Sequence, residues 1–149
     1  MSRHNDPRRC AIYLDGYSSK PDLLGNETQL EHIVRTVADR AGMQVIKLVT
    51  SEIESDLQKL KRDVFEDEGG ISIQALISTS HITLHTWPAR SAFMFDLVSC
   101  KSFDTLAVHR YLVGALAIES TAHYQVCDGR FDLLGSISSR DDTSPAATL

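Results

Sequence analysis

The chain lacks an excess of basic residues and a long apolar run. Its 15 lysines and arginines are outnumbered by 20 aspartates and glutamates, which gives a formal net charge of −5. Without a basic cluster the chain has little attraction for nucleic acid. The apolar runs are far shorter than the roughly 20 residues of a membrane span, and residues 1–9 lack the apolar segment of a signal peptide. We therefore expect neither nucleic acid nor a membrane as a partner.

Cysteine is also scarce. Cys10, Cys100 and Cys127 are an odd number, and their spacing is not that of a metal site. This usage is typical of a reducing cytoplasm, and it predicts no bound metal. A length of 149 residues favours one domain with a modest core, of the size that often completes its burial by oligomerising.

Hydrophobic periodicity predicts the fold class. Asn26 and Gln29 form a capping box for a helix that ends at Gly42, and Ser51 with Glu54 forms a second box for a helix over residues 51–65. Ser102 is expected to cap a later helix. The predicted strands cover residues 11–16, 45–49, 71–78, 93–98 and 122–126, the last followed by an Asp128-Gly129 turn.

This order of elements predicts helices packed on one face of a mainly antiparallel sheet, an α+β fold built as a two-layer α/β sandwich. We expect a flexible N-terminus over residues 1–8, a folded domain over 9–135 and a disordered tail over 136–149, which is rich in Ser, Asp, Thr and Ala.

One stretch holds most of the candidate chemistry: Thr79-Ser80-His81-Ile82-Thr83-Leu84-His85-Thr86-Trp87-Pro88. It combines a nucleophilic hydroxyl with two imidazoles. Ser80 and His85 are five residues apart, so an extended strand would place them on opposite faces. A tight turn at Ser80 would reset the alternation, and we expect such a turn to bring the two side chains together.

This stretch resembles the processing segment of the bacterial and archaeal S-adenosylmethionine decarboxylases, whose pattern reads approximately Glu-Ser-His-x-x-x-His-Thr-Trp-Pro-Glu. The likeness extends over about residues 9–135. It includes the first strand, the Gly-Gly-Ile-Ser approach to the motif, a segment similar to Asp-x-Phe-Thr-Cys, and the closing strand, at residues 11–16, 69–72, 96–100 and 129–132.

The resemblance implies a self-cleaving enzyme with a pyruvoyl cofactor. Ser80 would attack the carbonyl of Thr79, the chain would break between residues 79 and 80, and Ser80 would become a pyruvoyl group. The amine of the substrate would form a Schiff base with that ketone, which accepts the electrons released on loss of CO2. The resemblance also implies a cytoplasmic homodimer of cleaved protomers that decarboxylates S-adenosylmethionine for polyamine (spermidine) biosynthesis.

The resemblance also gives roles to single residues. His85 matches the histidine that assists processing, Ser72 the serine that helps to hold the intermediate of the acyl shift, and Cys100 the thiol that returns a proton to the substrate. Structural alternatives are a core histidine, an outward-facing strand serine and a buried apolar cysteine. His81 is shared with the family without an assigned role. Cys10, Cys127, His32, His109 and His123 fit no motif.

Three departures bear on the substrate. Thr79 replaces the glutamate before the serine, and Ala89 replaces a glutamate suited to ribose hydroxyls, which removes a contact for a nucleoside. The expected 51–65 helix stands where relatives have a loop with a phenylalanine that stacks on adenine; Phe65 at the end of the helix is either in reach of that role or, as we favour, a core residue. Arginine or ornithine therefore stays open as an alternative substrate, and so does a homologue that is not cleaved and acts as a binding or regulatory subunit.

Overall fold

The computed structural model describes residues 8–52 and 69–130. In chain order the elements are β1 (Arg8–Ser18), α1 (Pro21–Leu24), α2 (Glu27–Arg40), β2 (Val45–Glu52), β3 (Ile71–Ile77), β4 (Ser80–Trp87), the 3₁₀ turn η2 (Pro88–Arg90), β5 (Ala92–Ser99), α4 (Thr105–Ala115) and β6 (Ile118–Arg130). The strands form one sheet in the order β2-β3-β4-β5-β1-β6, and every neighbouring pair is antiparallel.

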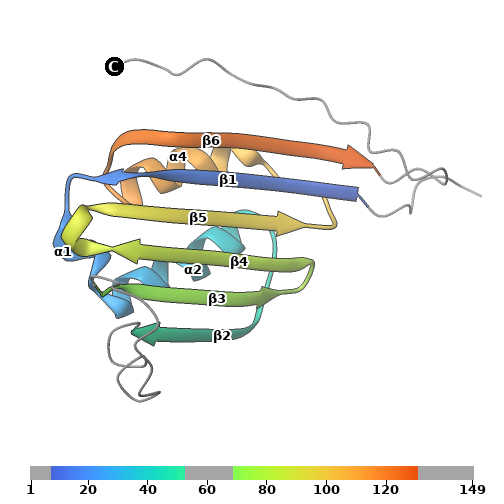
Figure 1. Ribbon diagram of the computed structural model, residues 1–149. Coiled ribbons are helices and arrows are strands. Elements are labelled where there is room, and N and C mark those ends of the chain that lie inside the picture. The colour runs from blue at the N-terminus through green and yellow to red at the C-terminus, as the bar shows by residue number, and fades with distance from the viewer. Residues whose placement is uncertain (1–7, 53–68, 131–149) are drawn as a thin grey trace, which may run out of the picture.

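The helices of the described residues pack on one face of this sheet, and none of them lies on the other face, which is called the open face (Figure 1). This confirms the predicted α+β class and the two-layer arrangement. Among the described residues, no helix has the length and apolar character needed to cross a membrane.

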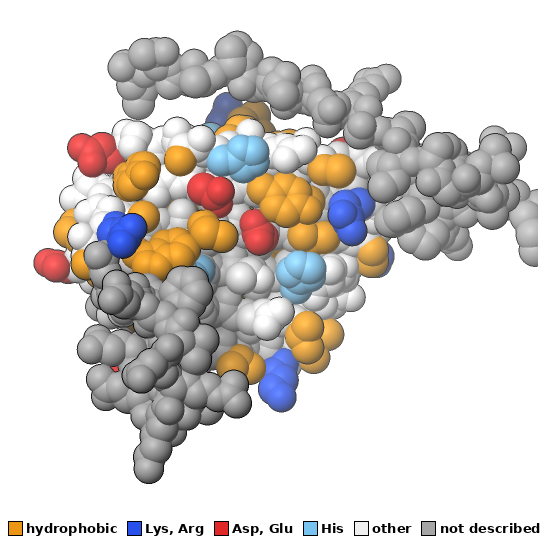
Figure 2. Space-filling model, in the orientation of Figure 1, with side chains coloured by type: hydrophobic (Ala, Val, Ile, Leu, Met, Phe, Trp, Pro, Cys, Tyr) orange, Lys and Arg blue, Asp and Glu red, His pale blue; other side chains and the backbone are white. Residues whose placement is uncertain are grey.

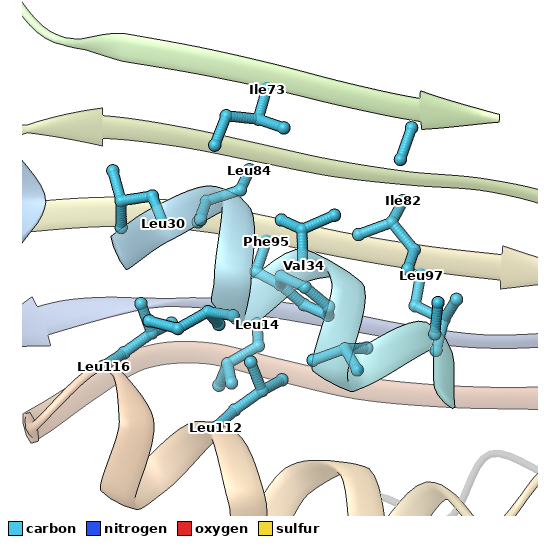
Figure 3. Packing of buried hydrophobic residues seen from close by; sticks show 14 of the residues in the cluster. Leu14, Leu30, Val34, Ile73, Ile82, Leu84, Phe95, Leu97, Leu112 and Leu116 are labelled. Carbon is cyan, nitrogen blue, oxygen red and sulfur yellow. The ribbon is translucent and has the colours of Figure 1, made fainter. Parts of the chain in front are cut away.

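Strand alternation places the core between sheet and helices. Along β3 the isoleucines and Ala75 are buried, whereas Ser72, Gln74 and Leu76 lie on the open face. On β4, Ile82 and Leu84 are buried in the same way. These side chains meet α2 and α4 in one cluster, shown in Figure 3, which also includes Leu14, Leu30, Val34, Phe95, Leu97, Leu112 and Leu116.

Helix α2 begins as the capping box predicts. The Asn26 side chain accepts a hydrogen bond of 3.0 Å from the Gln29 N–H. The helix ends at Arg40, and Gly42 follows with a φ of 71°, a conformation that glycine adopts without steric cost.

The start of β3 is fixed to the end of β4 by a buried hydroxyl. Thr86 Oγ1 donates to the Leu24 carbonyl at 2.7 Å and accepts from the Ile71 N–H at 3.2 Å. A Cβ at Gly70 would lie 1.9 Å from the Thr86 carbonyl oxygen, so glycine is required at this close approach. These contacts fix the position of the strand ends that carry Ser72 and His85.

Three local expectations are wrong. Ser51 does not begin a helix but lies within β2, paired with Ser72. The α4 cap is Asp104 instead of Ser102, and its carboxylate accepts from the Ala107 N–H at 2.9 Å. Asp128 and Gly129 do not form a turn, because both continue β6 and pair with β1. In each case sheet pairing or a competing cap overrides a local signal.

Some expectations lie outside the described residues. These are the helix beyond Glu52 together with Phe65, most of the N-terminus over 1–8 and the tail over 136–149.

Candidate functional site

Ser80 is the first residue of β4, directly after a two-residue turn that joins β3 to β4. Its register partners are Ile77 on β3 and Ser99 on β5. The side chain is partly buried, and its Oγ lies 3.0 Å from His81 Nδ1. The hydroxyl that sequence analysis singled out is therefore hydrogen-bonded to the next residue in the chain.

The peptide before Ser80 is held by the end of β5. The Cys100 N–H donates a hydrogen bond of 2.9 Å to the carbonyl oxygen of Thr79. The buried Ser99 Oγ donates to Thr79 Oγ1 at 3.0 Å. Both the carbonyl and the side chain of Thr79 are thus fixed, and the carbonyl carbon is made more electrophilic by the N–H that faces its oxygen.

Cys100 itself is exposed. It follows β5, whose last residue pairs with Ser80, so Cys100 lies at the same end of these strands as Ser80. Its exposure excludes the alternative of a buried apolar cysteine.

Ser72 and His85 form a second group, at the other end of β3 and β4. They are direct register partners, and Ser72 Oγ shares a hydrogen bond with His85 Nδ1. The His85 ring also contacts Trp87, with ring centroids 4.1 Å apart. Both residues lie on the open face of the sheet, because Ile71, Leu84 and Thr86 are turned towards the helices.

The two groups are well separated within one chain. Ser80 and His85 lie on the same regular strand, and five residues of strand span roughly 16 Å. The expectation that a turn at Ser80 brings its hydroxyl to His85 within one chain is therefore wrong. The turn precedes Ser80 and leaves the alternation of β4 intact, and the hydrogen bond of the Ser80 hydroxyl is with His81.

The open face also carries a cluster of charges that sequence analysis did not single out. Asp96 on β5 and Asp15 on β1 lie on this face with His81 and His123, and Figure 2 shows acidic and histidine side chains among apolar ones there. Burial raises the pKa of Asp96, the negative charge of Asp15 adds to this rise, and His81 opposes it. The alternation of β1 and β5 was the signal that could have found these carboxylates.

The remaining candidates contribute no metal site. Within residues 8–52 and 69–130 no cluster of histidines, cysteines and carboxylates is suited to a metal ion. All three cysteines are free thiols. His32 is exposed on α2, and His109 on α4 packs against Tyr124 with ring centroids 4.5 Å apart.

Most of the chain, from Cys10 to Cys127, is similar to a known protein family. Residues 10–127 match the family described as S-adenosylmethionine decarboxylase. The chain belongs to this family. It is 29% identical over 106 residues, 70% of this chain and 74% of the relative, to the S-adenosylmethionine decarboxylase proenzyme of Saccharolobus solfataricus.

Another relative of this chain is named for a different substrate. The arginine decarboxylase proenzyme of Pyrobaculum arsenaticum is 28% identical over 107 residues, 71% of this chain and 73% of that protein. The fold is that of the adenosylmethionine decarboxylase from Aquifex aeolicus VF5. That crystal structure superimposes with a TM-score of 0.62 at 18% identity, over 81% of this chain and 89% of the other.

Proposed function

We propose that this chain is a proenzyme that cleaves itself between Thr79 and Ser80 and then decarboxylates S-adenosylmethionine through a pyruvoyl group derived from Ser80. The observation that carries the proposal is the hydrogen bond from the Cys100 N–H to the Thr79 carbonyl oxygen. It supports cleavage at this peptide bond because it stabilises negative charge on the carbonyl oxygen under attack.

The first step is an acyl shift. Ser80 Oγ attacks the carbonyl carbon of Thr79, and negative charge develops on the oxygen that faces the Cys100 N–H at 2.9 Å. The bond from that carbon to the Ser80 nitrogen then breaks, which leaves an ester and a free amine. Ser99 supports this step by holding Thr79 Oγ1 and thus the orientation of the carbonyl.

The second step removes the Cα proton of Ser80 and breaks the ester, which leaves the carboxylate of Thr79 and a dehydroalanine that water hydrolyses to the pyruvoyl group with release of ammonia. His85 is proposed as the base, because an imidazole exchanges protons near neutral pH and Ser72 orients its ring. Ser72 is also proposed to help hold the intermediate of the acyl shift. Since His85 is roughly 16 Å from Ser80 along β4, we propose that the base is supplied by a second copy of the chain.

The open face supports this homodimer. No helix of the described residues covers it (Figure 1), and it exposes large apolar side chains on several strands, with Val49, Leu76 and Met94 each about half exposed at 54%, 49% and 46%. Apolar area of this kind is stabilised when a second surface excludes water from it. If the strands of the two copies run in opposite directions across a twofold axis, the Ser80 end of one sheet lies against the His85 end of the other.

The pyruvoyl group would supply a ketone that withdraws electrons from the α-carbon of a bound amino acid as CO2 leaves. The residues around Ser80 fit its formation, since the N–H of Cys100 is already hydrogen-bonded to the carbonyl oxygen of Thr79 and the Ser80 hydroxyl is hydrogen-bonded to the imidazole of His81. The exposed Cys100 thiol is proposed to return a proton to the substrate after decarboxylation.

S-adenosylmethionine is proposed as the substrate from the family to which the chain belongs. The residue at position 89, in the turn η2, bears on this choice. Ala89 is exposed in this turn, beside the end of β4 that carries His85. Arginine is the second candidate, because Ala89 offers no carboxylate to a ribose and one relative is named an arginine decarboxylase proenzyme. In either case the substrate is a cationic amino acid, and we place the reaction with S-adenosylmethionine in polyamine synthesis.

Self-cleavage is tested by intact mass. We expect the purified wild-type protein to give two fragments, residues 1–79 and 80–149, the second with a carbonyl that reacts with a hydrazide. Ser80→Ala is expected to give one full-length species, since the hydroxyl that attacks Thr79 is gone. Ser78→Ala, in the same turn, is the matched control and should cleave normally. A folded wild-type protein that stays intact would contradict the proposal and favour a binding or regulatory subunit.

The nucleoside site is tested by restoring the carboxylate. Ala89→Glu is expected to tighten binding of S-adenosylmethionine about tenfold or more, because a hydrogen bond to a charged group contributes about 1.5–3 kcal/mol. Calorimetry on cleaved protein measures this, with Ala89→Gln as the uncharged control. CO2 release is then followed with S-adenosylmethionine, arginine and ornithine in separate reactions. Release from arginine or ornithine alone would overturn the substrate and leave the cleavage unaffected.

A further inference from the structure

The Ser80 hydroxyl has an imidazole as its hydrogen-bond partner, and this imidazole has no part in the function proposed above. His81 Nδ1 lies 3.0 Å from Ser80 Oγ. When Nδ1 carries no proton it accepts from the hydroxyl, which is the arrangement of a nucleophile with its base. We propose that His81 is the general base that takes the Ser80 proton in the acyl shift. This inference rests on the self-cleavage proposed for the Thr79–Ser80 bond.

The geometry favours His81 over His85 for this step. His85 lies five residues further along β4, with its Nδ1 occupied by the Ser72 hydroxyl. The other hydroxyl at the turn, Thr79 Oγ1, is held by Ser99. His81 is thus the imidazole whose contact with the nucleophile is already formed within one described chain.

The surroundings of His81 suit a transient positive charge. Its register partners, Leu76 on β3 and Val98 on β5, are apolar and neither accept nor donate protons. The carboxylate of Asp96 lies on the same open face and interacts electrostatically with His81, with Asp15 behind it on β1. A negative charge on Asp96 stabilises the imidazolium that forms when His81 takes up a proton.

The step balances without another reactant. The proton of Ser80 Oγ moves to His81 Nδ1 as the bond between Oγ and the Thr79 carbonyl carbon forms. The bond from that carbon to the Ser80 nitrogen breaks, and the imidazolium gives its proton to this nitrogen as it leaves. The products are an ester and a free amine, and His81 is neutral again. A positioned base of this kind contributes about 10²–10⁴-fold to a rate.

The test uses His81→Asn, which keeps a hydrogen-bond acceptor near the position of Nδ1 but removes the base. Wild type, His81→Asn, His81→Ala and His85→Ala are produced in a cell-free system, and cleavage of the full-length chain is followed over time. Circular dichroism checks that each variant is folded. Hydroxylamine is added to the uncleaved protein, because it cuts an ester between residues 79 and 80 but leaves an amide intact.

We expect both His81 variants to cleave at least about 10²-fold more slowly than wild type, and their uncleaved chains to resist hydroxylamine. His85→Ala is expected to accumulate a chain that hydroxylamine cuts, because it stops after the acyl shift. Imidazole added to His81→Ala should restore part of the rate.

Three results would overturn the inference. Cleavage of His81→Asn at the wild-type rate would show that His81 orients the hydroxyl and does not act as its base. A His81 variant that hydroxylamine cuts would place the residue after the acyl shift. A folded wild-type chain that does not cleave would overturn both this inference and the proposed self-cleavage. The first two results would overturn the role of His81 alone.

Discussion

Co-expression of Ser80→Ala and His85→Ala chains is expected to restore cleavage that neither variant shows alone. In a mixed dimer, the intact Ser80 of the His85→Ala chain meets the intact Ser72 and His85 of the other copy. Since these residues are roughly 16 Å apart within one chain, the proposed site is completed across two copies. With random pairing of equal amounts, about half of the His85→Ala chains should be cleaved, because half of them pair with a Ser80→Ala chain in a twofold dimer.

Different affinity tags on the two chains show by pull-down that mixed dimers form, and intact mass shows which chain is cleaved. The control pairs His85→Ala with the double variant Ser80→Ala, His85→Ala, in which no copy has the imidazole, and this pair should stay uncleaved. If verified mixed dimers are not cleaved, His85 acts on its own chain or not at all. If no dimer forms, the proposed assembly is wrong.

Replacement of Cys100 is expected to separate self-cleavage from turnover. In Cys100→Ala the backbone N–H that faces the Thr79 carbonyl is retained, so the chain should still cleave to residues 1–79 and 80–149. The thiol that is proposed to protonate the substrate is lost, and turnover should fall by about 10²–10⁴-fold. Mass spectrometry measures the first effect, and CO2 release from the cleaved protein measures the second.

Cys127→Ala is the matched control for this experiment, since it removes a partly buried thiol on β6. It should change neither cleavage nor turnover. Unchanged turnover in Cys100→Ala would show that the thiol takes no part in catalysis. Loss of cleavage in Cys100→Ala would instead give the side chain a role in processing.

Much of the fold follows from the sequence alone. Alternation along residues 71–78 and the capping box at Asn26 and Gln29 are local patterns, and both were confirmed because tertiary contacts agree with them. The sequence also predicted that α2 ends close to Gly42, and the helix ends at Arg40, two residues before this glycine. The motif from Thr79 to Pro88 was equally visible, since the residue types and their spacing are read directly from the chain.

The tertiary structure decided which of these residues meet. The pairing of Ser72 with His85, and of the Cys100 N–H with the Thr79 carbonyl, depends on strand register, which is set by contacts distant in sequence. The extended conformation of β4 keeps Ser80 roughly 16 Å from His85, and the Ser80 hydroxyl is hydrogen-bonded to His81. The sequence by itself determined the candidate groups and the layers. The sheet determined their neighbours, because side chains are brought together by hydrogen bonds between strands that no local pattern records.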